Sequence, residues 1–385
     1  MAHARAALLA LCFVAPSSPL HVERAAGNVR ASDLSRRGAL AAAAGCGALI
    51  ATPATAAADA DVCCDRRDAV PRGSLIERIF DTRSGSFVPA RPERLLAPGS
   101  DRAAQLPRVV CCGEVHTAAA HHTAERRLVR ALSDVAERER RERGTERLPL
   151  AIGLEMCYRQ QQPVLDRFVF GGEAETLPAL RARLDWERTW GYAWEKYEPI
   201  FALAKARGVR LVGLNAPQPL VELVAADGLA RLDERLKPFV PARLDLGVAP
   251  HRARFEDRMA AAGAAHGAAL SPDGLDRYYE AEVFWEEYMA ETAARFVDAN
   301  PRHRLLVLAG ASHVEGRDGI PDRIAKRLAT PDAAGAARAD ERAPFVVLPE
   351  SVEWSPDGLP DVEQPLGRDT ADWIWYTQRP AAAAA

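Results

Sequence analysis

Short apolar runs separated by stretches of helical periodicity constrain the fold of this chain more than any other feature. The runs are Val109–Cys112, Leu148–Leu154, Val209–Leu214, His303–Ala309 and Phe345–Leu348. Residues 121–143, 162–170, 177–184, 197–207 and 322–328 instead follow the spacing of a helix with one buried stripe. Strands that alternate with helices are typical of βαβ units. We therefore expect an α/β fold with a mostly parallel sheet flanked by helices.

The segment between residues 217 and 300 carries no strand signal. Helices are expected at Leu220–Ala225, Leu229–Leu236, Phe255–Ala265 and Leu275–Val297. This segment predicts a helical subdomain, inserted before the last core strands and lying over one edge of the sheet. Near the start of the folded part, Leu75–Phe80 and Phe87–Val88 flank a turn at Thr82–Gly85 and predict a short hairpin.

The first sixty residues have the features of a targeting presequence. The short apolar run Ala6–Cys12 follows a basic residue, and Arg36-Arg37 precede a Gly- and Ala-rich run that ends in Ala54–Ala58. Two export signals in series, the second of twin-arginine type, resemble the layered presequence of thylakoid-lumen proteins in algae with complex plastids. We expect a chloroplast protein, located in the thylakoid lumen.

The domain boundaries follow from this interpretation. Residues 1–60 are expected to be the presequence, and residues 61–385 a single α/β domain with a flexible tail at 379–385. A retained membrane anchor at Gly38–Ala58 is the alternative, but that stretch is mostly alanine with few Leu or Ile. No stable membrane span is therefore expected in the mature chain.

Charge and cysteine usage exclude some classes of protein. The formal net charge is −3, so there is no basic signature for binding nucleic acid. Cys111 and Cys112 are adjacent, which is neither zinc-finger spacing nor a geometry that favours a disulfide. We expect both to be small buried core residues.

Polar side chains follow four of the apolar runs. They are Glu114 with His116, Glu155, Asn215 and His313. Because the carboxyl ends of parallel strands share one edge of a sheet, these groups are expected to converge. Histidine and glutamate are ligands for a divalent metal with an open position, and they also form general acid and base pairs. Each alone could equally be a helix cap or a loop contact, but G-x-x-H occurs twice, at Gly113–His116 and Gly310–His313.

These residues carry a resemblance to the ChaN-like family of haem-binding uptake proteins, in the superfamily that also holds Tiki metalloproteases and erythromycin esterases. It extends from about Ile79 to Leu348. Its features are Val109–His116 with His121-His122, Gly153–Met156 with Gln162-Pro163, Trp190-Gly191 with Tyr197, Gly213–Pro217, Met289-Ala290, Gly310–His313 and Gly319–Pro321. Two departures are Glu286, where relatives usually have aspartate, and Glu125, where they often have glutamine.

The resemblance implies a cleft at the strand ends and a small-molecule ligand. Bacterial relatives are described as iron-regulated surface proteins that hold haem through tyrosine across a dimer, so haem and a homodimer are expected here. The haem candidates are His121, His122, Tyr158 and Tyr288. His121 and His122 also resemble helix-start residues near the rim of the site, and each tyrosine resembles a packing aromatic.

The residues and the resemblance fit three functions, and they leave open whether the chain is an enzyme. The first is a haem- or tetrapyrrole-binding protein that handles iron or haem. The second is a metal-dependent hydrolase of Tiki type acting on peptides or esters, with Glu114, His116, Glu155 and His313 as catalytic residues. In that case His116, Glu155 and His313 hold the metal and Glu114 activates its water. The third is a silent scaffold in which the cluster is a buried hydrogen-bonded network.

Overall fold

The computed structural model describes residues 77–96, 106–143, 149–266, 270–329, 343–354, 360–362 and 366–378, and all of them belong to one compact unit. The presequence at 1–60, with its twin arginines and the possible anchor, lies outside the described residues. So does the tail at 379–385. Among the described residues, no helix combines the length and the apolar composition needed to cross a bilayer.

The described strands form one eight-stranded sheet in the order β2-β1-β8-β7-β3-β6-β4-β5. Their bounds are β1 Arg78–Asp81, β2 Ser86–Pro89, β3 Val109–Glu114, β4 Leu150–Tyr158, β5 Arg210–Asn215, β6 Arg304–Gly310, β7 Phe345–Val352 and β8 Trp373–Gln378. From β8 to β5 every neighbouring pair is parallel, whereas β1 pairs antiparallel with both β2 and β8. The predicted mostly parallel sheet and the predicted hairpin are confirmed.

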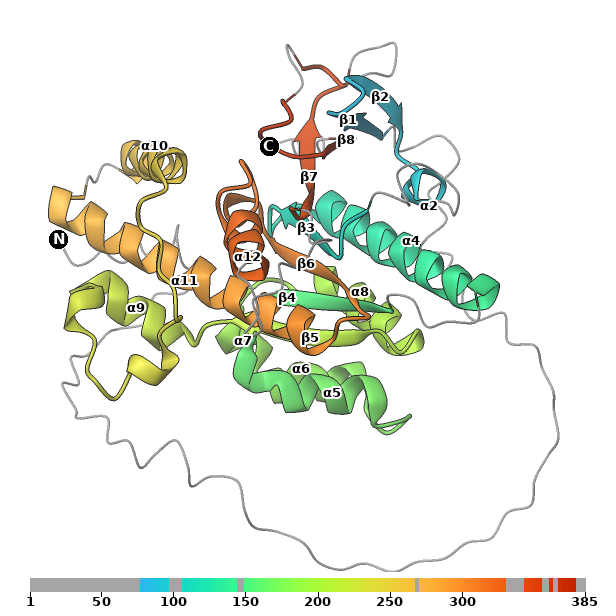
Figure 1. Cartoon of the computed structure of the whole chain (residues 1–385), viewed down its shortest axis with the longest axis horizontal. Helices are drawn as coiled ribbons and strands as arrows, with labels where there is room; N and C mark the ends of the chain where they lie inside the picture. Colours follow the sequence, from blue (N-terminus) through green and yellow to red (C-terminus); the bar gives the residue numbers. More distant parts are fainter. Residues whose placement is uncertain are drawn as a thin grey trace, which may run out of the picture. The chain divides into compact units, whose positions relative to one another are not determined.

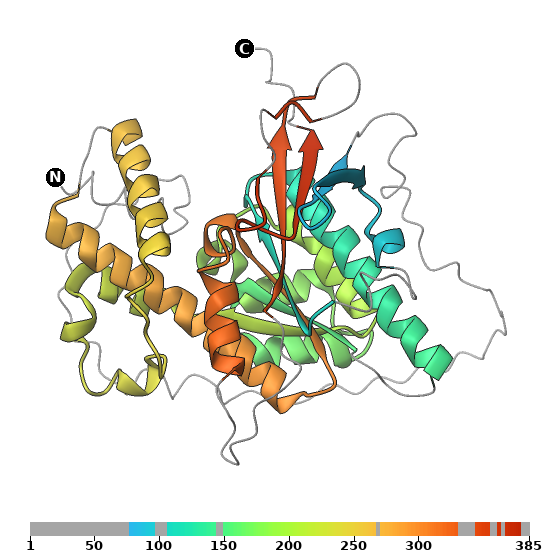
Figure 2. The same ribbon diagram turned by 45° about the horizontal axis from the view of Figure 1, so that its top comes forward.

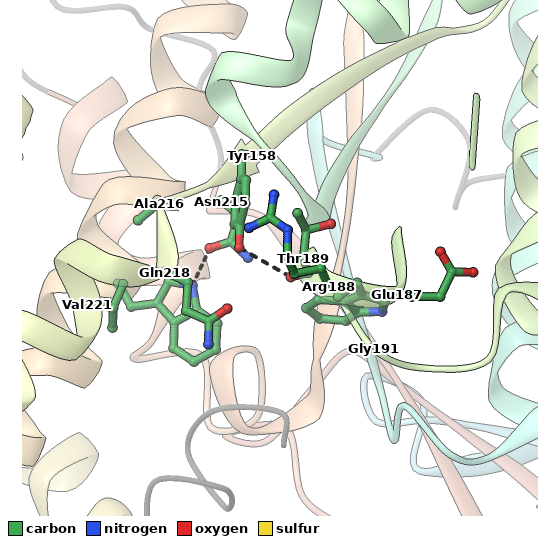
Figure 3. A pocket seen from close by; sticks show the side chains of 11 residues that line it. Tyr158, Glu187, Arg188, Thr189, Gly191, Asn215, Ala216, Gln218 and Val221 are labelled. Carbon is green, nitrogen blue, oxygen red and sulfur yellow. Dashed lines mark hydrogen bonds between the residues drawn. The ribbon is translucent and has the colours of Figure 1, made fainter. Parts of the chain in front are cut away.

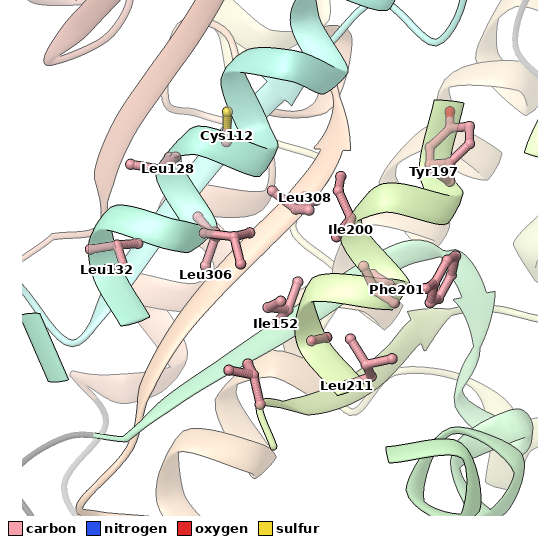
Figure 4. Packing of buried hydrophobic residues seen from close by; sticks show 14 of the residues in the cluster. Cys112, Leu128, Leu132, Ile152, Tyr197, Ile200, Phe201, Leu211, Leu306 and Leu308 are labelled. Carbon is pink, nitrogen blue, oxygen red and sulfur yellow. The ribbon is translucent and has the colours of Figure 1, made fainter. Parts of the chain in front are cut away.

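Helices cover both faces of this sheet (Figure 1). Their bounds are α2 Pro92–Leu95, α4 Ala119–Arg143, α5 Gln162–Phe170, α6 Leu177–Leu184, α7 Trp186–Thr189, α8 Trp194–Ala206, α9 Gln218–Asp227, α10 Ala249–His266, α11 Pro272–Ala299 and α12 Ile320–Leu328. One face packs against α4, α5 and α8, with Leu128, Ile200 and Phe201 meeting strand residues such as Ile152 and Leu306 (Figure 4). The other face packs against α9, α11 and α12. Central strands covered on both faces are buried along their whole length, which explains their continuous apolar sequences.

The helical subdomain is built on α11. The C-terminal half of this helix packs on the sheet, and its N-terminal half extends past the sheet edge beside α9 and α10 (Figure 2). A separate apolar cluster joins α10 to α11 there; its members are Phe255, Met259, Tyr278, Tyr279 and Val283. The predicted insertion before the last core strands is therefore confirmed.

Several predicted elements differ in the structure. The expected helix Leu229–Leu236 is wrong, because only a single 3₁₀ turn, Leu229–Arg231, forms there. Gly228 precedes it with a φ of +81°, and the carboxylate of Glu280 accepts a hydrogen bond from the Leu229 amide at 2.7 Å. The strand β8 was not predicted at all. Cys111 and Cys112 are buried free thiols, as expected.

Candidate functional site

The two G-x-x-H segments lie side by side at the carboxyl ends of adjacent strands. β3 and β6 pair in parallel with Glu114 opposite Gly310. His116 follows β3 in the loop that leads to α4, and His313 lies in a short 3₁₀ turn, Ala311–His313, directly after β6. The register therefore offsets the two segments by one residue and directs both histidines to one edge of the sheet.

Glu155 contacts the second segment, Gly310–His313, through both of its carboxylate oxygens. It lies inside β4, which continues to Tyr158 instead of ending at Leu154 as expected. Its Oε2 accepts a hydrogen bond from the Gly310 amide at 2.5 Å, and its Oε1 lies 3.6 Å from Nε2 of His313. Glu155 is fully buried, and Oε1 has no hydrogen-bond partner.

Gly310 leaves room for His116 in this arrangement. A Cβ at Gly310 would lie 3.1 Å from Nε2 of His116 and 3.6 Å from Oε2 of Glu155. A side chain would thus occupy the space between the imidazole and the carboxylate. Glycine permits this close approach of backbone and site groups.

Glu114 is buried behind His116. Its Oε1 lies 2.7 Å from Nδ1 of His116 and accepts a 2.8 Å hydrogen bond from the Tyr197 hydroxyl. Its Oε2 lies 2.8 Å from Nδ1 of His122. Burial opposes ionisation, but hydrogen bonds to His116 and His122 and their charges hold the pKa of Glu114 well below its ordinary value.

This geometry favours a positioning role for Glu114 over the activation of a water. Both of its oxygens face neighbouring side chains, so it does not meet the open space where a water would be activated. It instead fixes the ring of His116 through Nδ1, the usual arrangement for an imidazole whose Nε2 is a ligand or a base. His116 keeps 18% of its side chain exposed.

His313 is held by three carboxylates. Besides Glu155, its Nδ1 lies 3.1 Å from Glu286 Oε1 and 3.8 Å from Glu282 Oε1. Burial alone would lower the pKa of His313, but these carboxylates raise it to about 9. The imidazolium form therefore dominates at neutral pH.

A buried ion-pair network continues behind His313 into the helical subdomain. Glu286 Oε2 accepts a hydrogen bond from Nε of Arg323 at 3.0 Å and lies 3.0 Å from Nε2 of His251. Sequence reasoning noted Glu286 only as a departure from relatives and missed Arg323 and His251. No spacing signal marks these residues, because α10, α11 and α12 bring them together from distant parts of the chain.

The haem candidates differ in accessibility. Both nitrogens of His121 have partners, since the Val115 amide donates to Nδ1 and Ser351 Oγ lies 3.0 Å from Nε2. Burial lowers the pKa of His121 to about 4. Tyr288 is buried beneath Arg159, whose guanidinium lies 3.7 Å from the ring centroid. His122 is also buried, so neither histidine lies at a rim.

Tyr158 is the candidate that reaches open space. It ends β4 and is half-buried, and its hydroxyl donates to the carbonyl oxygen of Thr189 at 3.2 Å (Figure 3). It lines a cavity of about 70 Å³ together with Glu187, Arg188, Thr189, Trp190, Gly191, Asn215, Ala216, Gln218, Val221 and Trp285.

Two indoles connect this cavity to the acid and imidazole cluster. Trp190 packs edge-on against His116 with ring centroids 4.9 Å apart, and Trp285 packs in the same way against His313 at 4.8 Å. Nε1 of Trp285 donates to Asn215 Oδ1 at 2.5 Å. The pocket therefore lies next to the strand-end cluster, with one indole between it and each histidine. Sequence reasoning named Trp190 only as a feature of the resemblance and did not place either tryptophan in the site.

Potential metal ligands gather elsewhere than expected. Among the described residues, three side chains bring ligand atoms within 4.8 Å of one another at Glu114, His122 and Glu125, and again at His251, Glu282 and Glu286. The expected set of His116, Glu155 and His313 does not form such a group. His313 approaches Glu155, whereas His116 is directed at Gly310.

Comparisons with known proteins bear on the family and the fold. The family model described as "Haem-binding uptake, Tiki superfamily, ChaN" matches residues 102–324. The solved structure titled "Cofacial heme binding to ChaN of Campylobacter jejuni" aligns with a TM-score of 0.54 at 16% identity, covering 80% of this chain and 98% of that chain. An erythromycin esterase mutant in its open conformation covers 75% of this chain and 83% of that chain at 17% identity, but its TM-score of 0.35 supports no conclusion.

One curated relative is a plant protein. "Protein RETICULATA-RELATED 5, chloroplastic" of Arabidopsis thaliana is 24% identical over 192 residues, which is 48% of this chain. The matched region spans only 23% of that relative's length.

Proposed function

The chain belongs to the ChaN family of haem-binding uptake proteins in the Tiki superfamily, and on that premise we propose that it binds haem or a related tetrapyrrole at the strand-end pocket. The observation that carries this proposal is the position of Tyr158. Its phenol lies at a pocket between two indoles, and it is the one tyrosine or histidine among the four expected haem candidates that is not fully buried.

The residues around Tyr158 suit a tetrapyrrole in chemistry. A phenolate is an established axial ligand of haem iron. Burial raises the pKa of Tyr158, and a bound ferric iron would supply the positive charge that favours its phenolate. Trp190 and Trp285 line the same pocket with small exposed aromatic surfaces, 4% and 7% of the two residues. Arg188 has 76% of its side chain exposed at the same pocket and offers a cation for the carboxylates of a tetrapyrrole.

The size of the cavity determines how the ligand would lie. A cavity of about 70 Å³ is smaller than a typical small-molecule pocket and cannot enclose a tetrapyrrole. The macrocycle would therefore lie across the mouth, with one face on this chain. A second copy of the chain is the proposed cover for the outer face. Such open binding suits a protein that carries or hands over its ligand.

Haem titration of the purified full-length chain tests this proposal. We expect a saturable Soret shift for the wild type and its loss in Tyr158→Phe, because that substitution removes only the ligand oxygen. Tyr288→Phe is the matched control, since it removes a phenol oxygen from a buried ring and should leave the titration unchanged. A wild-type Soret shift that survives in Tyr158→Phe would reject Tyr158 as the ligand, and no shift in the wild type would reject haem binding.

A metal-dependent hydrolase of peptides or esters is the second candidate. It is favoured by the buried Oε1 of Glu155, which has no hydrogen-bond partner and lies 3.6 Å from His313 Nε2. His116, Glu155 and His313 would hold the metal, which supplies Lewis-acid activation of a water. His116 and His313 would then each need Nε2 free of a proton. These three residues do not form a compact group of ligand atoms, so the structure supports a hydrolase less well than it supports haem binding.

Hydrolysis assays separate the two candidates. Ester and peptide substrates should be cleaved only with added Zn²⁺ or Mn²⁺, and His313→Gln should abolish the reaction. His303→Gln, a substitution outside the site, should retain it. Metal-dependent turnover without any Soret shift would favour the hydrolase.

We further propose that the chain acts in a plastid, in the thylakoid lumen. The name of the Arabidopsis relative places that protein in the chloroplast, and the twin arginines Arg36 and Arg37 suit a lumenal second signal. Residues 1–60 fused to a fluorescent protein should reach the lumen. Replacing both arginines by lysine should stop the fusion in the stroma, and import that ignores this change would contradict a twin-arginine route.

A further inference from the structure

A cluster of three buried side chains lies behind His116, between the end of β3 and the first turns of α4. It consists of Glu114, His122 and Glu125, which are all nearly inaccessible to solvent. Nδ1 of His122 lies 2.8 Å from Glu114 Oε2 and 3.3 Å from Glu125 Oε2. The edge of the His122 ring also packs against Tyr197, with centroids 4.5 Å apart.

The tautomer of His122 follows from its other nitrogen. Nε2 lies 3.0 Å from the carbonyl oxygen of His116. A carbonyl oxygen only accepts, so Nε2 carries the hydrogen. Burial alone would lower the pKa of His122, but the carboxylates of Glu114 and Glu125 raise it to about 10, so without a metal Nδ1 carries a proton. A metal ion that displaces this proton would meet the lone pair of Nδ1 and oxygens of both carboxylates.

The polar atoms of this cluster lack the partners that buried groups normally have. Glu114 Oε2, His122 Nδ1 and both oxygens of Glu125 are without a partner in hydrogen-bond geometry. The two oxygens near Nδ1 therefore flank it without meeting the direction of an N–H bond. An atom located between the three ligand atoms would satisfy all of them together.

The charge balance of the cluster is incomplete. Among the residues that the structure describes, no arginine or lysine forms an ion pair with Glu114 or Glu125, and His122 is the only charged partner of Glu125. The group at His251, Glu282 and Glu286 differs in this respect. Arg258 lies 2.7 Å from Glu282 Oε1 and Arg323 lies 3.0 Å from Glu286 Oε2, so those carboxylates are already neutralised.

We propose that Glu114, His122 and Glu125 bind a divalent transition-metal ion. The ligands are Oε2 of Glu114, Nδ1 of His122 and the oxygens of Glu125, which can bind through one or both. Two carboxylates and an imidazole suit Zn²⁺, Mn²⁺ or Fe²⁺. The site goes beyond haem binding and does not depend on it. Its role is to fix Glu114, and through Glu114 Oε1 the ring of His116.

Glu125 supplies the second carboxylate of the site. A glutamine at this position would supply a neutral amide. Burial and the neighbouring Glu114 raise the pKa of Glu125 well above its ordinary value. A proton and a metal ion are therefore the two competing occupants of this cluster.

Titration of the haem-free full-length chain with Co²⁺ distinguishes these occupants. We expect binding of about one equivalent, with visible d–d bands of a low-coordinate nitrogen and oxygen site. Glu125→Gln is isosteric and should weaken Co²⁺ binding by about 100-fold or more. Glu125→Asp should keep binding but shift the bands. His303→Gln, which removes an imidazole outside both clusters, should leave Co²⁺ affinity unchanged.

Three results would overturn the metal site. One is wild-type protein that binds no Co²⁺ and no Zn²⁺. Another is Co²⁺ binding that survives in Glu125→Gln but is lost in His313→Gln, because the ion would then lie between the strand ends. The third is a protonated-carboxyl infrared band that is lost in Glu125→Gln and persists in the wild type at saturating Co²⁺, which would assign a proton to Glu125. None of these results depends on whether the chain binds haem.

Discussion

Gly310 determines how closely the ends of β4 and β6 and the loop after β3 approach one another. Its amide binds Glu155, and the space above its Cα is occupied by the imidazole of His116. A methyl group there must displace the ring, because the neighbouring Glu155 and Glu114 fix the surroundings. At the scale of single residues, the site therefore depends on glycine at position 310 as well as on its polar groups.

Gly310→Ala is expected to lower the free energy of unfolding by about 1–3 kcal/mol through overpacking. It should also weaken haem binding, because Trp190, which lines the pocket, packs against His116. Urea denaturation and haem titration measure the two effects. Gly367→Ala is the matched control, since a Cβ at Gly367 meets nothing within 4 Å. Equal stability of both variants would show that His116 is not packed against Gly310.

At the residue scale, the polar groups at the strand ends could be predicted from the sequence, but the role of each group could not. Glu114, His116, Glu155 and His313 could be selected because the ends of parallel strands share an edge. Which oxygen of Glu114 faces which imidazole depends on the phase of α4 and on Tyr197 from α8. Such contacts between distant elements leave no spacing signal.

At the scale of elements, α11 and α12 connect the subdomain to the site. Arg323 of α12 is buried between Glu286 and Glu287 of α11, with distances of 3.0 Å and 2.7 Å. Removing one partner from a buried ion pair leaves uncompensated charge.

Arg323→Met is therefore expected to cost about 3–5 kcal/mol of unfolding free energy. Arg141→Met is the control, since Arg141 is 71% exposed in its pair with Glu137 and should change stability by about 0.5 kcal/mol or less. Thermal and chemical denaturation of both variants would check this. Similar small losses in both would mean that α12 does not depend on the buried pair.

The carboxyl group of Glu350 in β7 makes the stability of the folded chain depend on pH. Burial and the nearby Glu315 raise its pKa from 4.5 to about 7. The folded state then holds this proton more tightly than the unfolded state, so stability falls as pH rises from about 4.5 to 7 and levels off above that range.

Between pH 4.5 and 7, the wild type is therefore expected to lose about 1–3 kcal/mol more than Glu350→Gln. Glu353→Gln, which replaces an exposed glutamate just beyond β7, should follow the wild type. Denaturation at a series of pH values measures the difference. Parallel profiles for wild type and Glu350→Gln would contradict it.

Elements with strong periodicity could be predicted, and those fixed by their neighbours could not. The five strand predictions correspond to β3 to β7, because strands covered on both faces are continuous apolar runs. β8 was missed because its aromatic-rich sequence, Trp373–Gln378, is stabilised by pairing with both β7 and β1. The helix expected after Gly228 does not form, and the reason is local, namely the positive φ of that glycine.

At the scale of the whole molecule, the family and the sheet are established, whereas the finer function is a proposal. The ChaN relative from Campylobacter jejuni shares the fold at 16% identity, too low to transfer its ligand contacts. The presequence, the lumenal location and the homodimer remain predictions. The structure of this chain has a phenol at the strand-end pocket, with two indoles beside it. A buried cluster of carboxylates and imidazoles lies next to these indoles.

Resonance Raman spectroscopy of the ferric haem complex tests the central claim most directly. With excitation in the phenolate-to-iron charge-transfer region, we predict ring modes of an iron-bound tyrosinate in the wild type and in Tyr288→Phe, and their absence in Tyr158→Phe. A wild-type complex that lacks tyrosinate modes, or that keeps them in Tyr158→Phe, would contradict ligation by Tyr158 at this pocket.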